Sequence, residues 1–310
     1  MVNGIILIDK PKGLTSYKVV EKLVRKFHLK KAGHLGTLDP AATGLLPVCL
    51  NEATKIVQFF INKDKEYEGT MLLGIVTDTG DMEGKIVKEC KALKATENQI
   101  HALFRKFTGK YFQTPPMYSA IKRDGKRLYS LAREGKQIER KKREGTIYSL
   151  KILCFSPPEV KFKVACSKGT YLRSLVNDIG KDLGCGATLK DLRRTKVGDF
   201  SIENAKSLKE ILEKDNLEDY LIDINSALKG LPQVTVKADF VRKALSGTPL
   251  YKVAISNKDF KLHKGLTVKV LSEDKGLISI AKCTREEKDL AKLAENGIVF
   301  NHIRVFQKPL

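Results

Sequence analysis

One acidic residue stands in a setting that could hold a carboxylate for chemistry. Residues 33–40 read GHLGTLDP, and the chain continues as AATGLLPV. Glycines permit backbone angles and close approaches that other residues resist, and Pro40 fixes the backbone directly after Asp39. Two interpretations follow from this pattern. Asp39 either caps its own backbone in an Asx turn, or it is presented on a rigid loop for a reaction.

The candidate partners of Asp39 in a reaction are His34, Tyr67 and Arg173. An ordinary aspartate, with a pKa of about 3.9, is already ionised at neutral pH. A pocket tight enough to hold a ligand would desolvate that carboxylate, so a nearby cation must offset the penalty. The chain contains no Gly-x-x-x-x-Gly-Lys-Ser/Thr loop, no Gly-x-Ser-x-Gly motif and no His-x-x-x-His pair. A nucleotide cofactor, a hydrolase nucleophile and a metal site therefore lack sequence support.

The charge of the chain predicts a polyanionic partner. Lysine and arginine number 57 against 36 acidic residues, which gives a net charge of +21. Residues 121–143 hold ten basic and three acidic residues, with Tyr129 among them. A basic segment with an interleaved aromatic residue is typical of proteins that follow a nucleic-acid backbone. The alternative is a basic protein whose charge serves only solubility.

The composition indicates a globular protein of two domains in a reducing compartment. The 310 residues are 42% hydrophobic and 30% charged, and no apolar run approaches the roughly 20 residues that cross a bilayer. We expect no secretion signal at the start of the chain. The six cysteines form no Cys-x-x-Cys pair, so we expect thiols in a cytoplasmic protein and no structural zinc.

Periodicity and capping residues predict an α+β fold. Helices are expected after Thr15 and Thr96, and also over residues 128–133, 172–183 and 188–194. Strands are expected at the amino terminus and over residues 65–76, 146–155 and 160–166. Residues 216–232 resemble an interdomain connection, and the short apolar runs beyond them predict a small β-rich module.

Several sequence blocks follow one another over about residues 2–200. The longest is AGHLGTLDPAATGLLPVCL at 32–50. The others are DKPKG at 9–13, KEY at 65–67, TGD at 79–81, PPMYSA at 115–120, CSKGTYLRSL at 166–175, and the stretch from GCGAT at 184–188 through LRR at 192–194. In this order the blocks resemble those of the bacterial tRNA pseudouridine synthase B (TruB) family, and the block at 32–50 is the most specific.

The resemblance implies a cofactor-free isomerisation of uridine to pseudouridine at position 55, in the T-arm of tRNA. It implies a pseudouridine synthase fold, with a mixed, mostly antiparallel sheet flanked by helices in a catalytic domain at 1–228. A basic RNA-clamping insertion would lie at about 121–145. A PUA-like RNA-binding module would occupy 232–310, and the protein would act as a monomer without membrane or nucleotide cofactor.

The resemblance also assigns roles to individual residues. Asp39 would be the nucleophile or the carboxylate that stabilises cationic character at the sugar, and Arg173 its ion-pair partner. Tyr67 would stack on the target base and relay the carbon-5 proton. The remaining candidates for substrate binding are His34, Tyr171, Leu192 and Lys10.

Two other functions compete with this one. A non-catalytic RNA-binding or ribosome-assembly factor could keep the same fold, and it would be expected to have a degenerate catalytic loop. A hydrolase could use His34 and Asp39 with an unassigned serine or threonine, but the chain carries no nucleophile motif for it.

Overall fold

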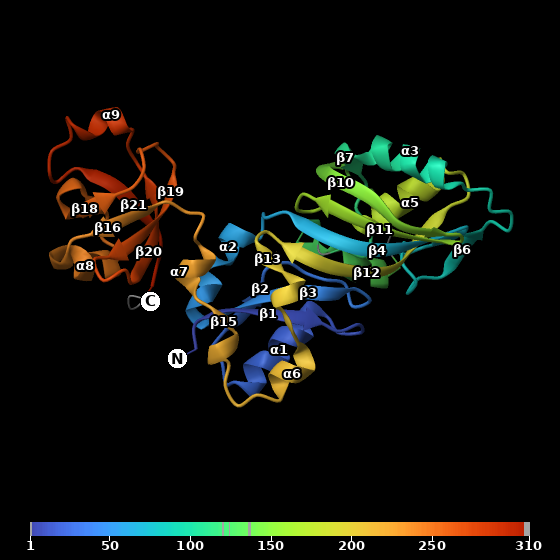
Figure 1. Cartoon of the computed structure of the whole chain (residues 1–310), viewed down its shortest axis with the longest axis horizontal. Helices are drawn as coiled ribbons and strands as arrows, with labels where there is room; N and C mark the ends of the chain where they lie inside the picture. The colour runs from blue at the N-terminus through green and yellow to red at the C-terminus, as the bar shows by residue number, and fades with distance from the viewer. Residues whose placement is uncertain (1, 120, 124, 136–137, 307–310) are drawn as a thin grey trace.

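The structure is a computed structural model that describes residues 2–119, 121–123, 125–135 and 138–306. Most of its strands form two sheets, a long one and a compact carboxyl-terminal one (Figure 1). The long sheet has eleven strands among the described residues. In spatial order, eight of them are β14 (Lys206–Ser207), β1 (Gly4–Lys10), β3 (Thr43–Leu50), β12 (Ala187–Val197), β4 (Lys65–Leu73), β11 (Glu159–Cys166), β10 (Arg143–Ser156) and β7 (Gly109–Gln113).

Three short strands attach to this sheet: β2 (Ala32–His34) on β3, β13 (Phe200–Ser201) on β12 and β15 (Leu221–Ile222) on β1. Two of the pairings are parallel, β1 with β14 and β12 with β3, and the others are antiparallel. The predicted mixed and mostly antiparallel sheet of an α+β fold is therefore confirmed.

Helices cover the two halves of the long sheet with separate hydrophobic clusters. Helices α3 (Glu97–Phe107) and α5 (Leu172–Asp182) pack on β4, β10, β11 and β12. Helices α1 (Ser16–Lys26) and α6 (Leu208–Leu212) pack on β1 and β3. The predicted helix starts are confirmed, because Thr15 accepts the N–H of Lys18 and Thr96 forms a capping box with Gln99.

The carboxyl-terminal residues form the predicted small β-rich module. Its strands are β17 (Leu250–Tyr251), β21 (Ile298–Val305), β20 (Leu277–Cys283), β19 (Thr267–Ser272), β16 (Gln233–Val236) and β18 (Ile255–Lys258), with helices α8 (Ala238–Leu245) and α9 (Glu287–Leu290) beside them. The module lies at the end of the long sheet near α2 (Val57–Phe60) and α7 (Ile224–Ala227) (Figure 1). Leu277, Ile280 and Phe306 share one buried cluster with Ile5 and Leu7, so both sheets contribute to a common core.

Two hairpins form separate two-stranded sheets outside the long sheet. One joins β5 (Ile75–Thr77) to β6 (Ile86–Glu89), and the other joins β8 (Lys122–Arg123) to β9 (Lys126–Arg127). The second hairpin and α4 (Leu128–Arg133) form part of the basic segment, which confirms the predicted helix there. The side chain of Tyr129, which the sequence placed among the basic residues, lies outside the described residues. No helix in the described part of the chain is long and apolar enough to cross a membrane.

The predicted helix over residues 188–194 is wrong, because these residues belong to β12 at the centre of the long sheet. Leu189 and Leu192 are three residues apart, as on one helix face. A register shift between Leu189 and Asp191 instead lets both leucines contact the cluster beneath α5. A β-bulge thus produced a spacing that mimics a helical period.

The predicted connection over residues 216–232 is wrong for its first part. Strand β15 pairs with β1, and Leu228 is buried in the cluster that includes Ile5 and Leu7. Local acidity and nearby glycine and proline resembled a linker, but pairing with the amino-terminal strand incorporates these residues into the long sheet.

Candidate active site

The Asp39 side chain forms an ion pair with Arg173, which lies far away in the sequence. Asp39 lies in the loop between β2 and β3, and Arg173 lies in the first turn of α5. Arg173 Nη2 is 2.9 Å from Asp39 Oδ2. The Arg173 side chain is only 7% exposed, whereas that of Asp39 is 44% exposed. The carboxylate is therefore accessible to a ligand, while its charge is balanced from the protein interior.

Arg173 is held by a second carboxylate that the sequence did not single out. Its Nη1 lies 3.2 Å from Asp81 Oδ2 and donates to the Thr79 carbonyl, while Nη2 donates to the Tyr118 carbonyl at 2.8 Å. Asp81 is itself buried, and its Oδ1 accepts the Thr79 hydroxyl at 2.6 Å. The TGD block was noted in the sequence without a role. The sequence feature that could have identified Asp81 is the one that identified Asp39, an acidic residue beside a glycine in a turn.

The loop that carries Asp39 is anchored through its backbone. Ser16 Oγ accepts the Leu38 N–H at 2.8 Å and lies 3.1 Å from the Leu38 carbonyl, to which it donates. The Pro40 carbonyl accepts the N–H of Gly13 at 2.8 Å. The Asp39 backbone carbonyl accepts the N–H of Ala42, whereas its carboxylate meets Arg173. An Asx turn therefore does not describe the use of this carboxylate.

Lys10 lies beneath the same loop and is fully buried. Its Nζ donates to the carbonyls of Pro11, Leu14 and Pro40 at 2.9, 2.7 and 3.3 Å. Burial lowers the pKa of Lys10 to about 8, although the charge of Asp39 opposes that shift. In this position the ammonium group ties the Pro40 carbonyl, directly after Asp39, to the segment that follows β1. A direct contact with substrate stays a prediction.

Tyr67 and Leu192 line the sheet side of the site. Tyr67 in β4 and Leu192 in β12 are half-buried, and both pack against the cluster beneath α5. The pKa of Tyr67 is raised, chiefly because the phenol is buried, and the charge of Asp39 acts in the same direction. The phenol is therefore protonated at neutral pH and can donate a hydrogen bond.

Tyr171 and His34 lie at the ends of two elements that meet at the site. Tyr171 precedes α5, and its backbone N–H donates to Gln113 Oε1 at 2.7 Å. Burial raises the pKa of Tyr171, and the charge of Asp39 also raises it. His34 ends β2, and its Nδ1 accepts the Gly36 N–H at 3.4 Å. Burial lowers the pKa of His34, so the imidazole is neutral at pH 7.

The fold brings four of the candidate residues to the Asp39 carboxylate or within reach of its charge. The charge of Asp39 acts on the pKa values of Lys10, Tyr67 and Tyr171, and its carboxylate contacts Arg173. Within the described ranges, no cluster of three or more His, Cys, Asp or Glu residues could hold a metal ion. His34 Nδ1 accepts a backbone N–H, that of Gly36, and no hydrogen bond between His34 and a serine or threonine hydroxyl is found among the described residues.

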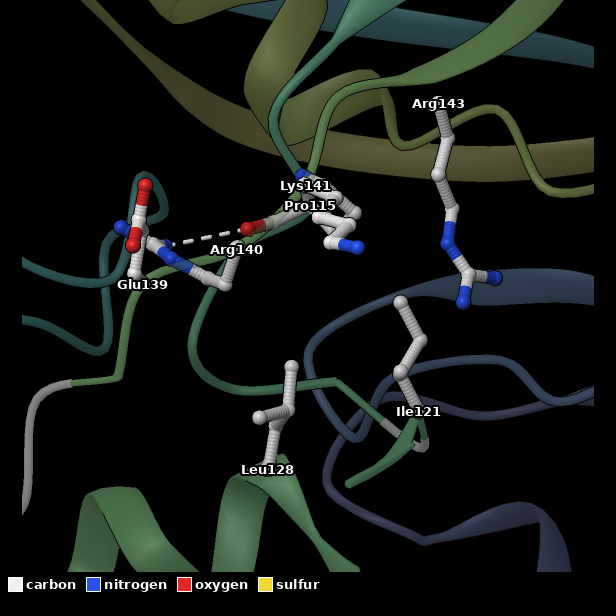
Figure 2. Close-up of a pocket in the computed structure, with 7 residues that line it drawn as sticks. All are labelled: Pro115, Ile121, Leu128, Glu139, Arg140, Lys141 and Arg143. Atoms are coloured by element: carbon white, nitrogen blue, oxygen red, sulfur yellow. Dashed lines mark hydrogen bonds between the residues drawn. The ribbon is translucent and has the colours of Figure 1, made fainter. Parts of the chain in front are cut away.

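A cavity of about 320 Å³ opens beside the basic segment (Figure 2). Its apolar wall includes Ile121 and Leu128, and Figure 2 shows the Arg143 side chain extending toward Ile121. Arg140 crosses another wall, where Nη1 donates to the Pro115 carbonyl at 3.0 Å. An apolar wall that basic side chains face suits a flat base attached to a phosphate backbone.

Comparison with protein families identifies the lineage of the chain. The model described as "TruB family pseudouridylate synthase (N terminal domain)" matches residues 24–172. A second model, "tRNA pseudouridylate synthase B C-terminal domain", matches residues 173–229. The chain belongs to the TruB family. The two matches meet inside the first turn of α5, so this TruB-family site draws Asp39 from the first match and Arg173 from the second.

Individual relatives of this TruB-family chain resemble it over nearly its whole length. The tRNA pseudouridine synthase B of Clostridium tetani is 44% identical over 292 residues, 94% of this chain and 99% of the relative. That of Francisella philomiragia is 43% identical over 291 residues, 91% of each chain. A solved H/ACA RNP bound to a substrate RNA containing 2'-deoxyuridine holds a chain with 26% identity and a TM-score of 0.75. That alignment covers 99% of this chain and 86% of the other.

Proposed function

We propose that this protein isomerises uridine to pseudouridine in tRNA, at position 55 of the T-arm. The observation that carries the proposal is the pairing of half-exposed Asp39 with buried Arg173. It keeps a carboxylate open to a ligand with a cation beside it, as a nucleophile or an electrostatic stabiliser requires. The names of the relatives and the resemblance of the Asp39 loop support tRNA as the substrate.

The proposed reaction breaks the bond between ribose carbon 1′ and uracil nitrogen 1 and forms a bond between carbon 1′ and uracil carbon 5. Carbon 5 loses its proton, and nitrogen 1 gains one. Asp39 attacks the substrate or stabilises cationic character at the sugar. Tyr67 stacks on the base, and its protonated hydroxyl has a hydrogen to donate. Asp39 and Tyr67 can reach a uridine in a folded arm only after the nucleotide has flipped out of the stack, which costs a few kcal/mol.

We assign the RNA contacts to two further parts of the chain. His34, Tyr171, Leu192 and Lys10 are assigned to the binding site for the flipped nucleotide, Lys10 through the loop that it supports. The basic segment at 121–145 holds the arm, with the cavity of Figure 2 at its base. Division of the chain into a catalytic domain at 1–228 and a PUA-like RNA-binding module at 232–310 is part of the same proposal. A monomeric state and a cytoplasmic location are also part of the proposal. The six free cysteines favour the location, because thiols persist in a reducing compartment.

Release of tritium tests the function directly. An unmodified tRNA transcript labelled at uridine carbon 5 should lose label to water when the protein is added. A transcript with cytidine at position 55 should lose none. Folded protein that releases no label from either transcript would exclude the synthase and favour the non-catalytic RNA-binding factor.

Variants separate catalysis from binding. Asp39→Asn should abolish release and leave tRNA affinity near that of the wild type. Asp64→Asn is the matched control, because this exposed carboxylate accepts the Tyr148 hydroxyl at 3.1 Å and lies outside the proposed site. If Asp39→Asn instead loses tRNA binding, the carboxylate has a structural role.

A further inference from the structure

Arg194 is a fully buried cation directly beneath the Asp39 loop. It lies in β12 and is only 1% exposed. Its Nε donates to the Leu45 carbonyl at 2.8 Å, Nη1 to the Thr37 carbonyl at 3.3 Å and Nη2 to the Gly36 carbonyl at 3.0 Å. One rigid guanidinium group therefore ties the segment before Asp39 to the strand after it.

The same guanidinium contacts Tyr67. The register of β12 on β4 places Arg194 opposite Tyr67, close enough for the guanidinium group to act on the pKa of the phenol. A guanidinium group has donors only, so it can present an N–H group to the Tyr67 oxygen but cannot accept the hydroxyl hydrogen. That hydrogen is left for another acceptor, such as a bound base.

Gly44 lets β3 approach the backbone of β12 at Arg194. A Cβ on Gly44 would lie 2.3 Å from the Arg194 carbonyl oxygen and 2.7 Å from its backbone nitrogen. A Cβ on Gly36 would lie 3.5 Å from Arg194 Nη1, an ordinary van der Waals distance. Both glycines also have positive φ angles, +131° at Gly36 and +101° at Gly44. Gly44 thus fits the close approach of the two strands, and Gly36 fits the backbone turn beside the guanidinium group.

Among the described residues, backbone carbonyl oxygens, and not a carboxylate, surround the positive charge of Arg194. Its guanidinium group donates to three backbone oxygens, and none of the ion pairs found in the described ranges includes it. A buried cation without a carboxylate is costly to stability. Its charge also lowers the pKa values of His34 and Lys10. A charge kept at such a cost, in contact with both halves of a site, indicates a role in function.

We infer that Arg194 is a positioning residue, whose guanidinium group holds the Asp39 loop and the Tyr67 hydroxyl in one fixed arrangement. The inference rests on the proposed function. Arg194 acts through Asp39 and Tyr67 and need not touch the RNA. Lysine cannot replace it fully, because a single ammonium point charge lacks the planar fork of donors.

The test compares Arg194→Met and Arg194→Lys with Arg193→Met. Arg193 is the neighbouring residue on β12, and its Nη1 and Nη2 bind the Asp9 carboxylate at 3.0 and 2.7 Å. For each variant we would measure thermal unfolding, tRNA affinity and the single-turnover rate of tritium release at saturating enzyme. All rates are taken well below the unfolding temperature of the variant.

Arg194→Met is expected to release tritium about 100-fold more slowly with tRNA affinity within about threefold of wild type, since misplacement by ~1 Å can cost that much. Arg194→Lys should fall between Arg194→Met and wild type, and Arg193→Met should match wild type. A purely structural role would lower the unfolding temperature and leave the rate of the folded variants unchanged, which overturns the inference. If Arg194→Met does not fold, wild-type turnover by Arg194→Lys overturns it equally. An inactive wild type would instead contradict the proposed function.

Discussion

Arg173 and Asp39 are in contact but differ sharply in burial. The distance from Nη2 to Oδ2 is 2.9 Å, while the side chains are 7% and 44% exposed. The cation is thus fixed inside the protein and the anion faces outward. A substrate can approach the carboxylate without displacing its counterion, which suits a residue that must stay ionised next to a base.

Replacing Arg173 should damage both stability and turnover. Arg173→Met leaves the carboxylates of Asp39 and Asp81 without their cation, and breaking the buried Arg173–Asp81 pair costs about 3–5 kcal/mol. The measurements are urea unfolding and the tritium-release rate. Lys106→Met is the control, because Lys106 forms an exposed pair with Asp182 at 2.8 Å, worth at most about 1 kcal/mol. Equal losses in the two variants would contradict the assignment.

Asp81→Asn should slow the reaction more than it weakens binding. The variant removes the second carboxylate that orients Arg173, so Asp39 loses a fixed partner. We expect the single-turnover rate to fall at least about 10-fold with unchanged tRNA affinity. Asp78→Asn provides a control in the same hairpin, since Asp78 Oδ1 accepts the Lys85 N–H at 2.8 Å and is exposed. A rate within twofold of wild type would show that Asp39 alone suffices to hold Arg173.

Lys10 should give stability a specific pH dependence. Its pKa is about 8 in the folded protein against 10.5 ordinarily. Between these values the unfolded chain binds more protons at this position than the folded chain. The contribution of Lys10 to stability therefore rises with pH in that window, by up to ~1.4 kcal/mol per pH unit, and is flat below it.

The measurement for Lys10 is urea unfolding at pH 7.5 and 9.5. The free energy of unfolding of wild type minus that of Lys10→Met should be larger at the higher pH. Lys65 also has a pKa lowered by burial to about 8, and taking the difference between the two proteins cancels its effect. The same difference at both values of pH would mean that the lysine keeps its ordinary pKa.

Gly44→Ala should destabilise the protein far more than Gly13→Ala. Both glycines have positive φ, +101° and +87°, so both variants carry backbone strain of about 1–2 kcal/mol. Only the Cβ at Gly44 would collide with another strand, at 2.3 Å from the Arg194 carbonyl oxygen, whereas nothing lies within 4 Å at Gly13. We expect a loss of at least about 3 kcal/mol for Gly44→Ala in urea unfolding. If the two variants lost comparable free energies of unfolding, the close approach of Gly44 to the Arg194 backbone would have no effect on stability.

Features set by neighbouring residues were predictable from the sequence. The caps at Thr15 and Thr96 depend on contacts three residues apart, and the α+β class follows from hydrophobic periodicity. The turn at Asp39 follows from the backbone preferences of its own glycines and proline. The TruB-type blocks added Arg173 and Tyr67 as partners of Asp39. These predictions needed only local chemistry and a motif that keeps its residues in order along the chain.

Only the tertiary structure showed how distant segments meet. Residues 188–194 have a helical spacing, but pairing with β4 and β3 on either side makes them a central strand. The second carboxylate on Arg173 and the carbonyls around Arg194 come from turns and strands far away in the sequence. Sheet pairing and burial depend on long-range contacts, which residue type and spacing alone do not encode. The sequence by itself therefore identified Asp39, and the fold decided what holds it in place.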